Sequence, residues 1–148
     1  ERQQKANELR TLLEKELAKA HIEAKFTWDI GATENEMQEA LLLIRQAQWR
    51  WDFGVSSHGG SFHAPQETMR ILGHGLNKVF QARMLISKVL VAHGYTDNVP
   101  LPDITTKEKA QQYIGLDMAV EKADKDKFLK EIVPEWLQKA KANGRIVN

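Results

Sequence analysis

Apolar residues recur every three or four positions over long stretches of this chain, the spacing of amphipathic helices. The first stripe predicts a helix that ends near Gly31, and its members are Leu9, Leu12, Leu13, Leu17, Ala20, Ala24 and Trp28. Thr33 followed by Glu36 has the pattern of a capping box, in which each side chain satisfies a free backbone amide. A second helix is therefore predicted over residues 34–53.

A segment without helical period separates this helix from the next. Residues 54–64 are rich in Gly and Ser and are predicted to form an irregular connection. Pro65 suits the first turn of a third helix, which should extend to about His93 before Gly94 ends it. Its expected buried stripe comprises Met69, Leu72, Leu76, Val79, Phe80, Ile86, Val89 and Leu90.

In the remaining part of the chain, the sequence predicts an extended segment followed by two further helices. Residues 95–104 contain two prolines and should be extended. Thr105 with Glu108 is expected to cap a short helix, and residues 118–143 predict a last, highly charged helix that Pro134 kinks or splits. No alternating apolar pattern typical of strands occurs, so we expect an all-α, bundle-like fold that forms a single helical domain over residues 1–148.

The composition is that of a folded domain rather than a disordered chain. Of the 148 residues, 42% are hydrophobic and 28% are charged. Lys and Arg total 21 against 20 acidic residues, so the charge gives no reason to expect a nucleic acid or an anionic membrane as partner. No apolar run approaches the roughly 18 residues of a membrane span.

The chain contains no cysteine, which excludes disulfides, zinc–thiolate sites, nucleophilic thiols and covalent haem attachment within it. It opens at Glu1 in the middle of a charged helical pattern, without a signal peptide. We therefore expect a segment of a longer protein. Nucleophile elbows, phosphate loops and HExxH motifs are also absent, so nothing supports a self-contained hydrolase.

Two of the five histidines, His58 and His63, fall in the irregular segment, where glycines allow the backbone to approach a large rigid group such as a haem or a metal. Hydrogen bonds from both imidazoles to loop carbonyls are the alternative interpretation. A zinc site would need further ligands, and the nearby Asp52 and Glu67 follow no recognised pattern. The other histidines are interpreted as packing or surface residues: His21, His74 and His93.

Trp49, Arg50 and Trp51 place large flat groups on opposite sides of the second predicted helix, just before the histidine segment. One interpretation is a helix buried between two neighbours. The other is that the aromatic rings and the guanidinium pack beside a porphyrin and its propionates. Periodicity by itself favours the helix buried between two neighbours.

Several separated motifs, in the same order, resemble the C-terminal part of the ammonia-forming, pentahaem cytochrome c nitrite reductases. They lie at residues 31–34, 45–53, 57–59, 63–65, 102–111, 114–118 and 133–136, and a basic tail follows. The resemblance covers roughly residues 21–144, whereas residues 1–19 match only as a generic amphipathic helix. It implies a periplasmic enzyme that reduces nitrite to ammonium on one haem c, with four bis-histidine haems relaying electrons.

The resemblance also implies residue roles. The histidine of the family's His-Ala-Pro motif is the distal axial ligand of a relay haem, and here that residue is His63. His58 would be a structural neighbour, and Trp49, Arg50 and Trp51 would belong to the haem environment. The attachment cysteines, the active-site residues and the calcium ligands of the family lie upstream of this segment. The chain alone is therefore expected neither to attach haem nor to reduce nitrite.

The implied partners are the haem-bearing remainder of its own chain, a second copy joined through the long helices, and an unidentified electron donor. A haem-free helical module that binds another protein is the competing hypothesis. The two hypotheses differ in whether the parent protein carries haem.

Overall fold

Every regular element of the computed structural model is helical across the residues that it describes, 1–57 and 59–146. The elements in chain order are α1 (Arg2–Asp29), α2 (Glu34–Ser56), α3 (Gly60–His63), α4 (Pro65–Ala92), α5 (Lys107–Tyr113), α6 (Met118–Lys127), the π-helix η1 (Phe128–Ile132) and α7 (Val133–Ala142). The all-α prediction is confirmed.

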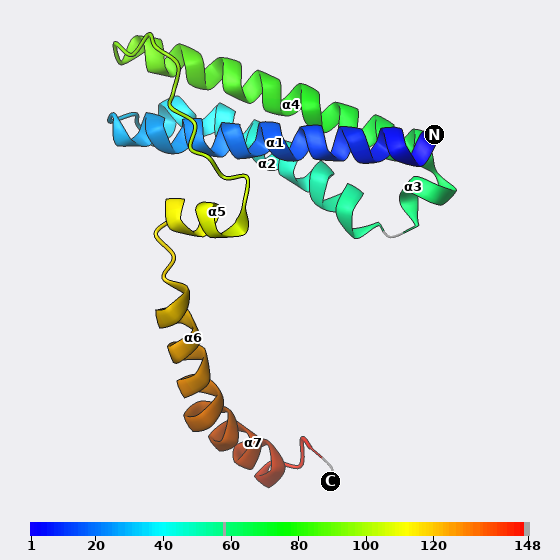
Figure 1. The fold of residues 1–148 in the computed structure, drawn as a ribbon, viewed down its shortest axis with the longest axis vertical. Coiled ribbons are helices and arrows are strands. Elements are labelled where there is room, and N and C mark those ends of the chain that lie inside the picture. Colours follow the sequence, from blue (N-terminus) through cyan, green and yellow to red (C-terminus); the bar gives the residue numbers. More distant parts are fainter. Residues whose placement is uncertain (58, 147–148) are drawn as a thin grey trace. The chain divides into compact units, whose positions relative to one another are not determined.

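Contacts divide the chain into an N-terminal unit, Glu1–Leu101, and a C-terminal unit, Pro102–Asn148. In the N-terminal unit α1, α2 and α4 lie side by side, and α2 runs antiparallel to the other two (Figure 1). The short α3 sits at the turn between α2 and α4. The expectation of a single helical domain stays a prediction.

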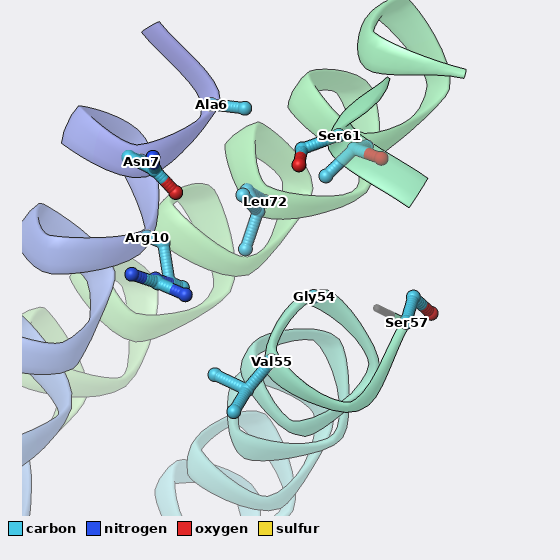
Figure 2. Close-up of a pocket in the computed structure, with 9 residues that line it drawn as sticks. Ala6, Asn7, Arg10, Gly54, Val55, Ser57, Ser61 and Leu72 are labelled. Carbon is cyan, nitrogen blue, oxygen red and sulfur yellow. The ribbon is translucent and has the colours of Figure 1, made fainter. Parts of the chain in front are cut away.

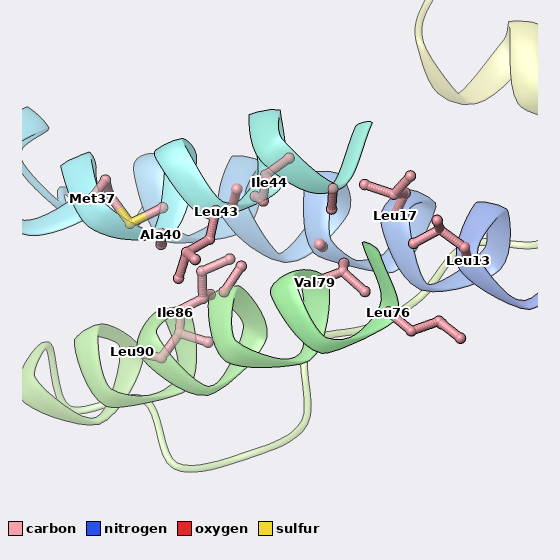
Figure 3. Packing of buried hydrophobic residues seen from close by; sticks show 14 of the residues in the cluster. Leu13, Leu17, Met37, Ala40, Leu43, Ile44, Leu76, Val79, Ile86 and Leu90 are labelled. Atoms are coloured by element: carbon pink, nitrogen blue, oxygen red, sulfur yellow. The ribbon is translucent and has the colours of Figure 1, made fainter. Parts of the chain in front are cut away.

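The core of the N-terminal unit lies where α1, α2 and α4 meet (Figure 3). Its largest fully buried apolar side chains are Leu13, Met37, Leu72, Val79 and Ile86. The extended chain after α4 closes one end of this core, where the rings of Phe26 and Tyr95 lie 4.7 Å apart. The core therefore forms entirely from residues that precede the C-terminal unit.

Three residues that were predicted to lie in the buried stripes are exposed. Leu12, Trp28 and Phe80 are exposed, while small residues occupy inward-facing positions of α1 and α4. Small side chains let the helices approach closely: a Cβ added at Gly75 would lie 2.6 Å from Leu13 Cδ2. The small residues fill these inward-facing positions, while the three larger side chains lie at the surface.

The helix ends around α2 and α4 follow the predicted capping. The backbone N–H of Thr33 donates to Glu36 Oε2 at 2.7 Å, and the backbone N–H of Glu36 donates to Thr33 Oγ1 at 3.4 Å. Pro65 occupies the first turn of α4, and Gly94 follows its end with φ +80°. The left-handed φ explains why glycine stands there.

The predicted irregular connection over residues 54–64 is wrong for most of its length, because α2 continues to Ser56 and α3 follows it. Two of the glycines, Gly54 and Gly60, lie where α4 approaches the backbone closely. A Cβ on Gly54 would lie 2.8 Å from Leu72 Cδ2, and one on Gly60 would lie 3.2 Å from Thr68 Oγ1. These contacts come from α4, so local sequence composition could not reveal them.

In the C-terminal unit the cap of the short helix is shifted by one residue from the prediction. Thr106, not Thr105, caps α5 by accepting a hydrogen bond from the Lys109 backbone N–H at 3.3 Å. Thr105 instead donates its hydroxyl and its backbone N–H to Asp103 Oδ1, at 2.6 and 3.0 Å. Asp103 thus holds Thr105 in the turn before the helix.

The predicted break at Pro134 is confirmed. The π-helix η1 lies immediately before α7, and the Val133 N–H donates to the Phe128 carbonyl five residues earlier. Proline has no N–H and its ring collides with the carbonyl four residues back, so a widened turn accommodates it. The last helical stretch is therefore divided into α6, η1 and α7, in place of one continuous α-helix.

Candidate functional site

His63 ends the short helix α3, in contrast to the irregular segment predicted for it. Its backbone N–H donates to the Gly59 carbonyl at 2.8 Å, and the Ala64 N–H donates to the Gly60 carbonyl at 2.9 Å. Thr68 Oγ1 on α4 donates in turn to the Ala64 carbonyl at 3.1 Å. These bonds hold the turn that carries His63 firmly onto the start of α4.

The imidazole of His63 is exposed, and its ring nitrogens have no hydrogen-bond partner among the residues described. The Phe62 ring meets it edge-on, with centroids 5.0 Å apart at 87°. A Cβ on Gly59 would lie 2.9 Å from His63 Cδ2, so the backbone there runs close to the ring. Hydrogen bonding to loop carbonyls, the alternative raised by the sequence, is therefore not what this part of the structure shows for His63.

The remaining histidines occupy different settings. His58 lies outside the described residues, and His21 is exposed on α1. His93 Nε2 lies 3.1 Å from Glu36 Oε1, and His74 Nδ1 lies 3.4 Å from Arg70 Nη1. The three described histidines other than His63 thus lie on or at the ends of the long helices.

The pKa of Glu36, in the first turn of α2, is strongly shifted. Hydrogen bonds from the backbone and side chain of Thr33, followed by that from His93, lower its pKa from 4.5 to about 2. These donors stabilise the carboxylate form. The carboxylate therefore joins the start of α2 to the end of α4 across the helix contact.

Trp49 and Arg50 line a surface groove, whereas Trp51 packs against the core. Trp49 is 74% exposed, and Arg50 Nη1 donates to the Gln46 carbonyl at 2.7 Å. Trp51 packs against the buried cluster with its Nε1 shielded from solvent, and no partner for that atom is found within the described residues. A helix buried between two neighbours would be covered on both sides, but the described residues cover only the side of Trp51.

The groove has a volume of about 280 Å³ and runs between α2 and α4. Its lining residues are Trp49, Arg50, Phe53, Arg70, Ile71 and His74. Arg70 is held by Glu67 through bonds of 2.7 and 2.5 Å, and this pairing lowers the pKa of Glu67. The groove thus combines exposed aromatic rings with guanidinium groups.

Sequence reasoning missed the contributions of Phe53, Arg70 and His74 to this groove. Arg70 and His74 are four residues apart, so they share a face of α4. That spacing was visible in the sequence. Which face of α4 lies beside Trp49 depends on how α2 and α4 pack, and the sequence pattern did not show this.

Neither a metal-binding cluster nor a membrane-spanning helix is found within the described residues. Among the residues that the structure describes, no group of three or more His, Cys, Asp or Glu side chains is arranged to hold a metal ion. Within the same residues, no helix is both long and apolar enough to cross a bilayer.

Comparison with known proteins places these residues in a family. The sequence profile of cytochrome c552 matches residues 1–144. The chain belongs to the cytochrome c552 family. This is a family of c-type cytochromes, yet the chain has no cysteine to which a haem could be attached.

The chain is similar to proteins named cytochrome c-552 from three bacteria. It is 74% identical over 146 residues to that of Bacteroides fragilis and 71% identical over 146 residues to that of Bacteroides thetaiotaomicron. It is 63% identical over 147 residues to that of Porphyromonas gingivalis. In each case 99% of this chain is covered but only 30% of the relative, so the chain spans less than a third of their length.

Proposed function

We propose that this chain is the C-terminal helical part of a periplasmic, ammonia-forming cytochrome c nitrite reductase, and that His63 is the distal axial ligand of a relay haem. The observation that carries the proposal is the exposed His63 imidazole, held on a firm turn with no partner for its ring nitrogens among the described residues. Membership of the cytochrome c552 family and the order of the motifs support it.

The surroundings of His63 fit an iron ligand. A neutral imidazole nitrogen is a common axial ligand, and its lone pair must point away from its own chain. The edge of Phe62 and the backbone at Gly59 restrict how the ring turns. A bound haem supplies an iron centre that gains and loses one electron. The chain's own part is to present the nitrogen and keep its direction constant.

The groove beside Trp49 fits the periphery of a porphyrin. Aromatic rings of Trp49 and Phe53 offer flat apolar contact, and Arg50 and Arg70 offer guanidinium donors to propionates. Trp51 would support this surface from the core side of α2. His58 stays a predicted neighbour of the haem.

The remaining parts of the activity would reside outside these residues. Because the chain lacks cysteine, the haems would be attached to the rest of the parent protein, which would also hold the nitrite site and calcium. The parent would form a homodimer through its long helices and receive electrons from a separate donor. This chain would then serve as a haem-supporting and dimer-forming part of that enzyme.

The test is His63→Ala in the full-length parent protein, with the exposed His21→Ala as the matched control. Loss of an axial nitrogen is expected to change the low-spin haem spectrum and to slow electron delivery, while nitrite binding is retained. The control should behave as the wild type. An unchanged haem spectrum in His63→Ala would refute the ligand role. A colourless parent protein would favour the haem-free interaction module.

A further inference from the structure

A second, smaller pocket lies in the N-terminal unit where α1, the end of α2, α3 and α4 come together. Figure 2 shows Asn7 and Arg10 on α1, Val55 and Ser57 at the end of α2, and Ser61 on α3. The pocket has a volume of about 140 Å³. It shares no lining residue with the groove beside Trp49.

Among the described residues that line this pocket, Arg10 is the charged one and none is a carboxylate. Its side chain is half-buried, yet it forms no ion pair or hydrogen bond with the residues described. Two other arginines, Arg70 and Arg83, are each held by glutamates. A guanidinium partly withdrawn from water without a partner is unfavourable, so the site favours an anion.

Neutral hydrogen-bonding groups surround this charge. Asn7 contributes an amide, and Ser57 and Ser61 contribute hydroxyls. Ser61 reaches the pocket because α3 packs closely on both the end of α2 and the start of α4. A Cβ on Gly60 would lie only 3.1 Å from Ser57 Cβ and 3.2 Å from Thr68 Oγ1. The close approach at Gly60 therefore helps to assemble the polar wall of the pocket.

The volume limits what can enter. A cavity of about 150 Å³ holds a molecule the size of benzene, with roughly six non-hydrogen atoms. The 140 Å³ pocket is thus suited to a carboxylate or a phosphate and is far too small for a porphyrin. Two oxygens on such a ligand match the planar fork of a guanidinium.

We propose that this pocket binds a small oxyanion of the carboxylate or phosphate class, with Arg10 as its principal ligand and Asn7, Ser57 and Ser61 as hydrogen-bonding partners. The proposal does not depend on haem or on the role of His63. The oxyanion is either a free ion or a carboxylate carried by another part of the parent protein, and the two sources give different results below.

The experiment is thermal unfolding of the 148-residue chain, followed by far-UV circular dichroism, in increasing inorganic phosphate at constant ionic strength. The wild type should show a saturable rise in Tm. Arg10→Gln should weaken the apparent affinity about tenfold or more, because charge-assisted hydrogen bonds are lost. Arg10→Lys should bind with intermediate affinity, since it keeps the charge without the fork.

Arg45→Gln is the matched control, because it removes the same charge from an exposed position on α2 outside the pocket. It should respond to phosphate as the wild type does. Equal phosphate-dependent rises in Tm for wild type and a folded Arg10→Gln chain would overturn the proposal, as would no rise in either. Variants are compared only where their helical spectra match, so a misfolded Arg10→Gln is replaced by Ser61→Ala, for which weakened binding is likewise expected.

Thermal unfolding of the full-length parent protein distinguishes the two sources of the oxyanion. If the oxyanion is a free ion, phosphate raises the Tm of the parent as it does that of the chain. If a carboxylate of the parent occupies the pocket, phosphate has no effect there, while Arg10→Gln lowers the Tm without added ligand. Both results support an oxyanion site and differ only in the source.

Discussion

The N-terminal and C-terminal units are both helical, but they are stabilised in different ways. In the N-terminal unit, apolar side chains from α1, α2 and α4 form one continuous buried cluster. In the C-terminal unit, no side chain among residues 102–146 is buried. Its helices are defined by local features, such as the Asp117 side chain that accepts hydrogen bonds from the first turn of α6.

The difference shows that regular helical structure and a hydrophobic core are separate properties. The C-terminal unit exposes large apolar side chains, among them Phe128 and Trp136, whose rings meet edge-on at 5.4 Å. Helices shorter than about 12 to 15 residues are marginal in water without tertiary packing. We therefore expect the N-terminal unit to carry most of the chain's stability.

The largest expected contrast is between two leucine truncations. Leu13→Ala removes a fully buried side chain and should lower the free energy of unfolding by about 2 to 5 kcal/mol. Leu137→Ala truncates a side chain that is 47% exposed, and it should cost less than about 1 kcal/mol. Urea unfolding followed by circular dichroism measures both. Similar losses would show that the C-terminal unit has a core of its own.

A smaller contrast concerns ion pairs. Arg83 on α4 donates to Glu23 at 2.8 and 2.6 Å and also to the buried Glu16, both on α1. Arg83→Gln should cost about 2 kcal/mol, below the roughly 3 to 5 of a fully buried pair, because Arg83 remains partly exposed. The same urea experiment measures this loss.

Lys139→Gln is the counterpart in the C-terminal unit, where it removes an exposed pair with Glu135. It should leave the unfolding midpoint unchanged, because exposed pairs contribute little. A loss from Lys139→Gln as large as that from Arg83→Gln would contradict the contrast between the units.

The smallest expected effect is the acid dependence contributed by Glu36. Its pKa in the folded chain is lowered from 4.5 to about 2, so its contribution is fully present above pH 4.5 and is lost as the pH falls towards 2. Glu36→Gln should therefore flatten the decrease in stability over that interval. Chemical unfolding at a series of pH values measures the slope.

Thr33→Ala provides the control for this assignment, because it removes the hydroxyl hydrogen bond that is the second largest cause of the lowered Glu36 pKa and keeps the backbone one. It should also reduce the acid dependence, although Glu36 is retained. An unchanged slope in both variants would mean that other groups determine the acid response of the N-terminal unit.

Predictions based on neighbouring residues succeeded where the physical cause is local. The capping box at Thr33, the proline at the start of α4, the glycine at position 94 and the break before Pro134 were all predicted. Each depends on backbone hydrogen bonds or on φ angles within one turn. The cap of α5 was misplaced by one residue because Asp103 competes for Thr105.

Predictions that required knowledge of packing failed or stayed open. The glycines of residues 54–64 were interpreted as part of an irregular connection, yet Gly54 lies within α2, where Leu72 of α4 passes close to its backbone. Trp28 and Phe80 were placed in the buried stripes but are exposed. Both the close approach at Gly54 and the exposure of Trp28 and Phe80 depend on residues that are far away in the sequence.

The helical class, most helix ends and the importance of His63 could be predicted from the sequence. The packing of the helices was needed to show that Trp49 lines one groove with Arg70 and His74. It was also needed to show that His63 ends a helical turn and that Arg10 lines a pocket with residues at the end of α2 and on α3. The reason is physical: hydrogen bonds along a helix join near neighbours, whereas grooves and pockets form between segments that are far apart in the chain.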